Sequence, residues 1–393
     1  TLEDKYAKVD GRIYLSGIQA LVRLPMMQRL RDQAAGLNTA GFVSGYRGSP
    51  LGMLDEALWK AQPHLEKHHV KFVPGVNEEL AATAVWGTQT TALIGPARYD
   101  GVFAMWYAKG PGVDRCADVF KHMNHAGTAE HGGVLLVAGD DHGAYSSTLP
   151  HQSDHLFAAC MIPMLYPCNV QEYLDLGLHA WAMSRFAGCA VGFKALADTV
   201  ESSATVDANP FRVQITLPTS FPLPPGGLNT RLSNERLGVQ ARAQEALMQD
   251  YKIYAAIAYA RANRLNRTMM DSPHARLGII ASGKSYSDVL EALDELGIDE
   301  QGAKDMGLRL YKVAMPWPLE PDGIREFAQG LDEILVVEEK RQMVEYQLKE
   351  QLYNWREDVR PRVIGKFDEK GEWFNGKGDW LLSAKADFSV AQI

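Results

Sequence analysis

Short apolar segments alternate with helix-like segments through the first half of the chain, and this alternation limits the possible folds. The apolar runs have the length of buried strands and lie at residues 39–45, 71–74, 100–107, 133–138 and 188–194. The helical patterns between and before them lie at residues 17–35, 54–64 and 170–186. Strands that are apolar throughout, joined by helices, are typical of a parallel sheet with helices on both faces. We therefore expect an α/β fold with a doubly wound, mostly parallel sheet.

A second α/β pattern follows a linker. The run FPLPPGG at residues 221–227 is the clearest linker signal, and a long helical stretch, one helix or two, follows at residues 235–264. Beyond residues 271–273 we expect strands at 276–281, 308–314 and 333–338, and helices at 287–296, 321–330 and 342–354. The expected organisation is a first domain at 1–228, a smaller α/β domain at 229–364, and a connector at 365–393 to a downstream part.

The composition excludes several classes of protein. With 46% hydrophobic and 22% charged residues, the 393-residue chain has ample material for a core. A net charge of −8 argues against a general nucleic-acid binder. No apolar run reaches the about 18 residues that span a bilayer, and no basic-then-apolar leader stands at the start, so we expect no membrane association.

The cysteines carry no metal or disulfide pattern. Their positions are Cys116, Cys160, Cys168 and Cys189. None of them forms a CxxC pair, which argues against a zinc site, an iron–sulfur cluster or a disulfide framework in this chain. We expect a cytoplasmic protein, and the first and last residues suggest a piece of something longer.

Glu78 is the first candidate catalytic residue. It lies in PGVNEELAATAVWG, residues 74–87, where an apolar strand runs into an alanine-rich helix. A carboxylate in the first turn of a helix is stabilised by the free N–H groups and the helix dipole. Local sequence leaves two interpretations open, a helix-end charge and a glutamate that activates a cofactor.

Two further strand-end segments carry cations. The turn GYRGSPLG at residues 45–52 offers the Ser49 hydroxyl and the Arg47 guanidinium, and it is neither a phosphate loop nor a GxGxxG motif. Lys109 and Arg115 flank a Gly-Pro-Gly bend after another strand. In an open α/β sheet such turns line the ligand site, so these cations could hold an acidic substrate. The alternatives are a tight turn with a helix cap and a loop with solvated charges.

Two acidic segments complete the candidates. The loop at residues 139–155 is dense in Asp, His and hydroxyl groups and contains His151, but its spacing fits no standard metal-ligand pattern. We expect this loop to form hydrogen bonds or line a pocket, and we expect no metal site. The run EEKR at residues 338–341 follows a strand and is expected to be a solvated helix start.

Taken together, these segments resemble the 2-oxoacid:ferredoxin oxidoreductases. GYRGSP at 45–50 resembles the family's GYPGTP turn, and residues 77–87 resemble its NEKxAxxxAxG helix. Residues 139–147 resemble its DDPxxxSS loop, while 276–283 and 335–339 match the second domain of indolepyruvate ferredoxin oxidoreductase. The order and spacing agree over about residues 10–354, and the fused bacterial form of this enzyme is the nearest match.

The resemblance implies thiamine diphosphate chemistry on a pyrimidine-binding domain followed by a transketolase C-terminal-like domain. Glu78 would be the catalytic residue and contact N1′ of the aminopyrimidine. The other implied cofactor contacts are Asn77, Gly48 and Ser49. The implied substrate contacts are Ser49, Arg47, Lys109, Arg115 and His151. Arg47 departs from the family's common proline, and the Gly-Pro-Gly after Lys109 departs from its common His-Val-Gly.

Half of such a site is missing from the sequence. The Gly-Asp-Gly motif that binds the diphosphate and metal is absent, as are the cluster cysteines. The resemblance therefore implies that Mg²⁺ and 4Fe–4S clusters lie in another subunit or a downstream part. It further implies coenzyme A, a ferredoxin-like acceptor and a homo-oligomer.

The implied reaction is the oxidative decarboxylation of indolepyruvate or other aryl pyruvates to acyl-CoA and carbon dioxide. One alternative is the same chemistry on pyruvate, 2-oxoglutarate or a branched 2-oxo acid. The other alternative is a non-catalytic scaffold subunit that keeps the fold.

Overall fold

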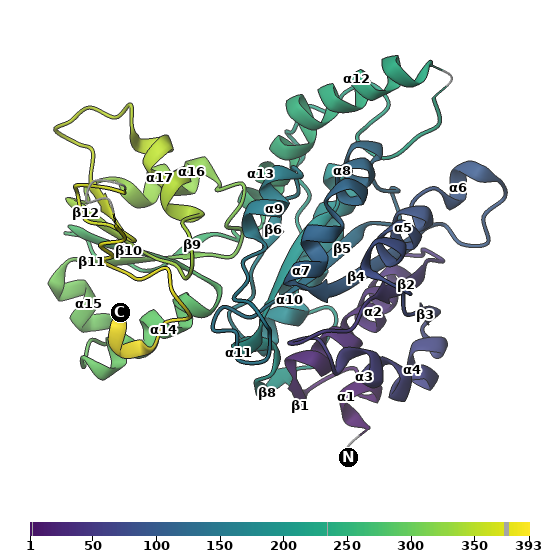
Figure 1. The fold of residues 1–393 in the computed structure, drawn as a ribbon, viewed down its shortest axis with the longest axis horizontal. Coiled ribbons are helices and arrows are strands. Elements are labelled where there is room, and N and C mark those ends of the chain that lie inside the picture. Colours follow the sequence, from purple (N-terminus) through teal and green to yellow (C-terminus); the bar gives the residue numbers. More distant parts are fainter. Residues whose placement is uncertain (2, 234, 373–376) are drawn as a thin grey trace.

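Two α/β units lie side by side in the computed structural model, which describes residues 1–393 apart from 2, 234 and 373–376 (Figure 1). The first unit contains a six-stranded sheet in the order β3-β2-β4-β5-β7-β6. The second contains a five-stranded sheet in the order β13-β12-β10-β11-β9. The predicted α/β class with mostly parallel sheets is confirmed.

All neighbouring strands of the first sheet are parallel. Their bounds are β2 Ala40–Gly45, β3 Val70–Phe72, β4 Val102–Lys109, β5 Val134–Asp140, β6 Met164–Leu165 and β7 Val191–Leu196. Each predicted apolar run overlaps one of these strands. The edge strand β6 was not predicted, because two residues leave no periodic signal.

Strand β4 shows why the first sheet is buried on both faces. Phe103, Met105 and Tyr107 belong to one core cluster. The alternate residues Ala104, Trp106 and Ala108 belong to the other. Since successive side chains of a strand point to opposite faces, both faces of this sheet are covered.

Helices form those two covering layers. The long helices α2, Gly17–Ala34, and α10, Val170–Ala187, share the first core cluster and contact each other. The opposite face is covered by α5, Glu78–Thr88, and α8, Ala117–Ala126, with residues in the second cluster. Ser16 starts α2 with a capping box, which fixes where the helix begins despite Pro25 within it.

Shorter elements complete the first unit. An antiparallel ribbon joins β1, Arg12–Ser16, to β8, Ser203–Asp207, and was not predicted. The short helices are α1 Asp4–Ala7, α3 Leu54–Lys60, α4 Gln62–Lys67, α6 Thr91–Ile94, α7 Gly110–Arg115, α9 Asp154–Ala159 and α11 Ala197–Val200.

The second sheet is parallel except for β9, which pairs antiparallel with β11. Its strands are β9 Arg267–Met270, β10 Leu277–Ser282, β11 Leu308–Val313, β12 Glu333–Val337 and β13 Arg362–Ile364. Its helices are α14 Gly283–Glu295, α15 Glu300–Met306, α16 Pro321–Ala328 and α17 Val344–Leu352. Strand β9 lies before the turn at residues 271–273, after which the strands of this sheet were expected. It was not predicted, because it is a largely exposed edge strand and carries no apolar pattern.

The helical stretch at 235–264 is continuous through a π-helical turn, Met248–Lys252, that joins α12, Leu237–Leu247, to α13, Ile253–Ala262. Helix α12 projects from the molecule in Figure 1 and has no buried residue, whereas α13 contacts α10 and shares its core. The domain boundary expected at 228/229 stays a prediction.

Of the last stretch the structure describes residues 365–372 and 377–393, and Leu382 and Phe388 within it join the core beside α14. The regular structure near the chain's end is a 3₁₀ turn, Val390–Gln392. Across the described part of the chain, no helix combines the length and apolar character needed to cross a membrane.

Lys252, in the π-helical turn, gives a testable consequence of burial. It is 1% exposed, and burial lowers its pKa to about 8. The unfolded chain therefore binds more protons between pH 8 and the ordinary lysine pKa, so stability should rise with pH across that window. We expect Lys252→Met to raise the unfolding free energy at pH 7 by on the order of 1–3 kcal/mol and to flatten this rise. Urea unfolding at pH 7 and 9.5 measures the unfolding free energy and its dependence on pH. The control is Lys121→Met, which makes the same change at an exposed position of α8.

Candidate functional site between β2 and β4

The first sheet changes direction between its strands β2 and β4. The chain passes from β2 to its neighbour β3 on one side and then crosses to β4 on the other side. In open α/β sheets, a crevice for ligands forms at the carboxyl ends of two such strands. The turn after β2, the start of α5 and the start of α7 all meet at this edge.

Gly45, the last residue of β2, and Gly48, in the turn that follows, allow this segment to lie against the end of β4. A Cβ on Gly45 would lie 2.2 Å from the carbonyl oxygen of Tyr107, so no other residue fits there without displacing a strand. A Cβ on Gly48 would lie 2.8 Å from Cδ of Lys109. The predicted site residue Gly48 therefore packs on the side chain of another predicted site residue.

Helix α5 presents Glu78 at its first turn. Asn77 caps the helix, since its side chain accepts a hydrogen bond of 2.9 Å from the Leu80 N–H. The indole of Trp106 donates a hydrogen bond of 3.0 Å to the Glu78 carbonyl, which fixes the helix start on β4. The Glu78 side chain is only 6% exposed. In the described part of the protein no donor forms a hydrogen bond with its carboxylate, and its nearest cation is Arg115, with Nε 3.9 Å from Oε2.

The Gly-Pro-Gly segment is a helix start and not the bend that the sequence predicted. Helix α7 begins at Gly110 with Pro111 in its first turn, a position where proline's fixed φ is favourable. A Cβ on Gly112 would lie 2.7 Å from Cγ of Glu78. Gly112 thus lets α7 close over Glu78, and sequence reasoning did not single it out.

A cavity of about 360 Å³ opens in front of Glu78. Five predicted site residues line it, namely Arg47, Asn77, Glu78, Lys109 and Arg115. Tyr46 and Pro111 also line it and were not predicted as site residues. Three cationic side chains face one buried carboxylate, which suits a ligand that combines an anionic group with a hydrogen-bond donor.

Ser49 contacts the loop that follows β5. Its Oγ is hydrogen-bonded to Oγ of Ser146. The Asp141 carboxylate organises this loop by accepting the N–H groups of Tyr145, Ser146 and Ser147 at 2.9–3.0 Å. Burial raises the pKa of Asp141, but these bonds outweigh it and lower the pKa overall. The loop thus forms hydrogen bonds, as expected.

His151 lies beside the cavity but does not line it. Its Nε2 lies 2.8 Å from Asp114 of α7, and its Nδ1 lies 3.4 Å from Asp140 at the end of β5. Burial lowers its pKa, but the two carboxylates outweigh burial and raise the pKa overall. His151 therefore contacts α7, and its predicted contact with substrate stays a prediction.

No group of three or more His, Cys, Asp or Glu side chains suited to a metal ion occurs among the residues that the structure describes. The acidic groups of the 139–155 loop are engaged elsewhere. Asp140 accepts hydrogen bonds from Ser153, and Lys194 pairs with Asp154 at 2.6 Å.

Replacing Gly112 tests the contact between α7 and Glu78. We expect Gly112→Ala to lower the unfolding free energy by about 1–3 kcal/mol, because the new methyl group would overlap the Glu78 side chain. Gly87→Ala is the matched control, since Gly87 lies in α5 and a methyl group added there would have no atom within 4 Å. This control should be neutral or stabilising, because alanine favours helices. Urea unfolding of both variants measures the difference, and equal midpoints would contradict the close contact.

The chain is similar to several known proteins. Residues 266–393 match the family described as the indolepyruvate ferredoxin oxidoreductase middle domain. Indolepyruvate oxidoreductase subunit IorA of Methanothermobacter marburgensis is 25% identical over 337 residues, covering 85% of this chain and 48% of the relative. The Pyrococcus abyssi subunit is 25% identical over 361 residues, covering 91% and 50%. The chain thus spans about half the length of these relatives.

Solved structures share the fold. The 2-oxoglutarate:ferredoxin oxidoreductase of Magnetococcus marinus, solved with 2-oxoglutarate, coenzyme A and succinyl-CoA, has a TM-score of 0.66 at 15% identity, covering 91% of this chain and 62% of that one. A split-gene transketolase has a TM-score of 0.50 at 11% identity, covering 96% and 95%. These likenesses agree with the predicted pyrimidine-binding and transketolase C-terminal-like folds. The sequence matches confirm the resemblance to the indolepyruvate ferredoxin oxidoreductases, since residues 266–393 match that family's middle domain and the relatives align with most of the chain.

Proposed function

We propose that this chain supplies the pyrimidine-activating half of a thiamine diphosphate site. The complete enzyme would carry out the oxidative decarboxylation of 2-oxo acids, with indolepyruvate and related aryl pyruvates as substrates. The observation that carries this proposal is the Glu78 carboxylate, which is buried, faces a cavity, and accepts no hydrogen bond within the described chain.

A buried carboxylate without donors is unfavourable unless a ligand completes it. The aminopyrimidine of thiamine diphosphate fits this requirement, because its protonated N1′ is a hydrogen-bond donor. Glu78 would hold that proton. When bound, thiamine diphosphate supplies a nucleophilic carbon and a ring that takes up electrons.

The cationic wall of the cavity suits the other reactant. Arg47, Lys109 and Arg115 surround the opening, and Arg115 is also paired with Glu79 at 3.5 Å. A 2-oxo acid carries a carboxylate, which a guanidinium or ammonium group holds by a charge-assisted hydrogen bond. We propose that Ser49 and these cations orient the substrate. His151 contacts Asp114 of α7 and would support that helix beside the cavity.

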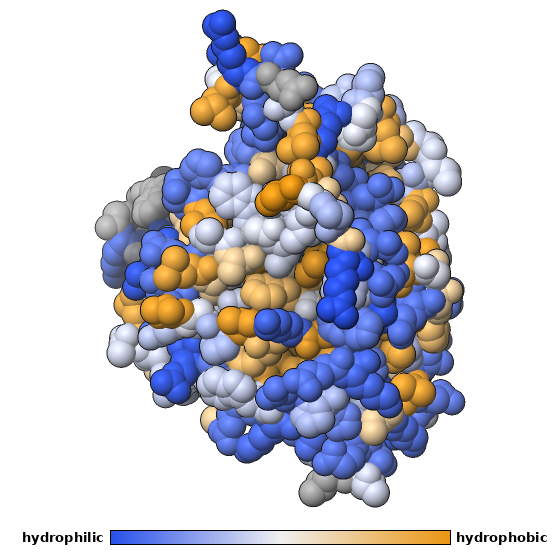
Figure 2. Space-filling view, turned by 90° about the vertical axis from the view of Figure 1, so that its right-hand side faces the viewer, coloured by the Kyte–Doolittle hydropathy of each residue, from blue (hydrophilic) through white to orange (hydrophobic). Residues whose placement is uncertain are grey.

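The remaining half of the site would come from protein outside these residues. Exposed apolar side chains surround the start of α5, with Val76 82% and Leu80 55% exposed. Figure 2 shows apolar areas among polar ones on the side of the molecule where α5 lies. We propose that this surface meets the part that binds the diphosphate, Mg²⁺ and 4Fe–4S clusters, from which electrons pass to a ferredoxin-like acceptor while coenzyme A takes the acyl group.

The direct test replaces Glu78 by glutamine in the complete assembly. We expect Glu78→Gln to reduce decarboxylation of aryl pyruvates by about 100-fold or more, because the carboxylate that holds the N1′ proton is lost. Titration of thiamine diphosphate with Mg²⁺ should show weaker binding in parallel.

Glu56→Gln is the matched control, since it makes the same change on an exposed side chain of α3, which pairs with Lys60 and does not line the cavity. Near wild-type turnover in Glu78→Gln would refute the assignment. An inactive wild-type assembly that binds no thiamine diphosphate would favour a scaffold subunit.

The substrate class needs a separate measurement. A panel of indolepyruvate, phenylpyruvate, pyruvate, 2-oxoglutarate and a branched 2-oxo acid would be compared by kcat/KM. We expect the aryl pyruvates to lead, and a larger value for pyruvate or 2-oxoglutarate would redirect the proposal to that acid.

A further inference from the structure

The acidic run after β12 is buried, contrary to the solvated helix start that the sequence predicted. Glu338 and Glu339 are each 6% exposed. Glu338 accepts the N–H groups at the start of α17, from Met343, Val344 and Glu345. The run follows a strand that ends inside the molecule, against the loop of the first unit. Local sequence could not reveal this, because the partners are about 200 positions away.

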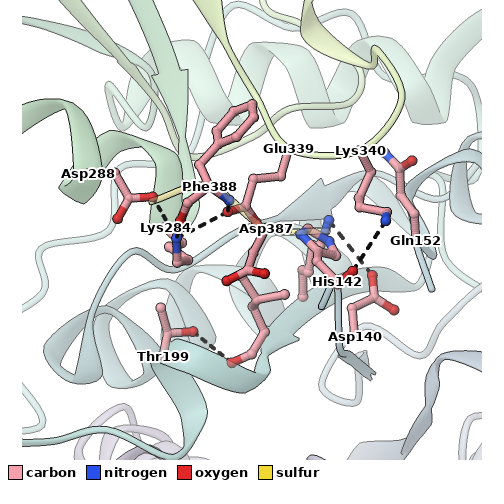
Figure 3. Close-up of polar contacts among 12 residues, drawn as sticks. Asp140, His142, Gln152, Thr199, Lys284, Asp288, Glu339, Lys340, Asp387 and Phe388 are labelled. Atoms are coloured by element: carbon pink, nitrogen blue, oxygen red, sulfur yellow. Dashed lines mark hydrogen bonds and ion pairs between the residues drawn. The ribbon is translucent and has the colours of Figure 1, made fainter. Parts of the chain in front are cut away.

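Glu339 pairs with His142, the second residue of the loop after β5 (Figure 3). The Nδ1–H of His142 donates to Oε2 of Glu339 over 2.5 Å, and both side chains are at most 2% exposed. Lys284 donates to the other carboxylate oxygen over 3.1 Å, and the Phe388 N–H does so over 2.9 Å. Burial alone would raise the pKa of Glu339, but His142 and Lys284 outweigh it and lower the pKa to about 2, so the glutamate is ionised.

The second unit holds the same loop at further points. Lys340 donates from Nζ to the His142 carbonyl over 3.2 Å. Near the loop's other end, the Gln152 side chain exchanges two hydrogen bonds with the backbone of Arg341, at 2.9 and 3.0 Å. Between them the Tyr145 hydroxyl donates to Asp387 over 3.1 Å. Residues 141–153, which we call the strand-end loop, are therefore pinned at both ends and in the middle.

The strand-end loop contacts the turn after β2 at Ser49, two residues after the cavity-lining Arg47. Asp141 precedes His142 and holds the three successive N–H groups that place Ser146. Ser146 in turn is hydrogen-bonded to Ser49, and the Ser147 hydroxyl lies 3.5 Å from the Ser49 carbonyl. A continuous series of contacts thus runs from Glu339 in the second unit to Ser49 in the turn after β2.

We propose that Glu339 is a positioning residue for Ser49, acting through His142 and the strand-end loop. The second unit then serves as a clamp that fixes the orientation of the Ser49 hydroxyl, to which the proposed function gives a contact with substrate. The link to substrate rests on the proposed function, whereas the clamping of the loop rests on the contacts alone.

Glu339→Gln in the complete assembly tests the clamp, because it keeps the side chain's size and removes its charge. We expect the amides of Tyr145, Ser146 and Ser147 to exchange hydrogen about tenfold faster, the change that follows from weakening a hydrogen bond to a charged group. The KM for the 2-oxo acid should rise by about tenfold with a much smaller change in kcat, because Ser49 contributes to binding throughout.

Glu333→Gln is the matched control. It makes the same change at the opposite end of β12, in a partly exposed ion pair with Arg362. Exchange in Glu339→Gln at the rate of this control would overturn the proposal. Faster exchange with an unchanged KM would overturn its extension to Ser49. The exchange result does not depend on the outcome for Glu78→Gln, whereas the KM is compared in assemblies that turn over the 2-oxo acid.

Gln152→Ala provides a second variant in case Glu339→Gln fails to fold. Gln152 is only partly buried and bonds to backbone, so its loss leaves no charge unpaired. The loop amides should again exchange faster, and unaltered exchange would contradict the clamp.

Discussion

The reversal of strand order between β2 and β4 is the constraint on which the rest of the site depends. Because the connections from these two strands leave in opposite directions, their carboxyl ends are not covered by a common helix. The turn after β2 and the first turns of α5 and α7 are left to enclose this space. Gly45 lets the end of β2 lie close to β4, and Gly112 lets α7 lie close to Glu78. Helix α5 contributes the Glu78 side chain itself.

The strands, the cations and the acidic residue of the site could be predicted because each carries a local signal. Apolar runs marked the central strands, and Arg47, Glu78 and Lys109 stand at or just after the ends of strands, where parallel topology gathers them at one edge. What could not be predicted depends on distant partners. Glu339 is buried because it pairs with His142, which is far away in the sequence. Gly112 matters because Glu78 packs against it, and this contact also joins distant positions.

Three short edge strands escaped prediction for a different reason, whereas the three-residue edge strand β3 was predicted. Strands β6, β9 and β13 have two to four residues each, so no period emerges, and β9 and β13 are also partly exposed to solvent. The helix start at Gly110 was misjudged because glycine and proline signal turns in isolation. The structure shows that they begin helix α7. This helix lies so close to Glu78 that position 112 requires a residue without a side chain.

The buried carboxylate at Glu78 also affects the stability of the chain on its own. A carboxylate removed from water without donors raises the free energy of the folded state, and an apolar side chain of similar size would not. The fold tolerates this because the two large core clusters on either side of the sheet stabilise it independently. Under the proposed function a donor on the ligand would recover this free energy, so part of the free energy of ligand binding would already be set when the protein folds.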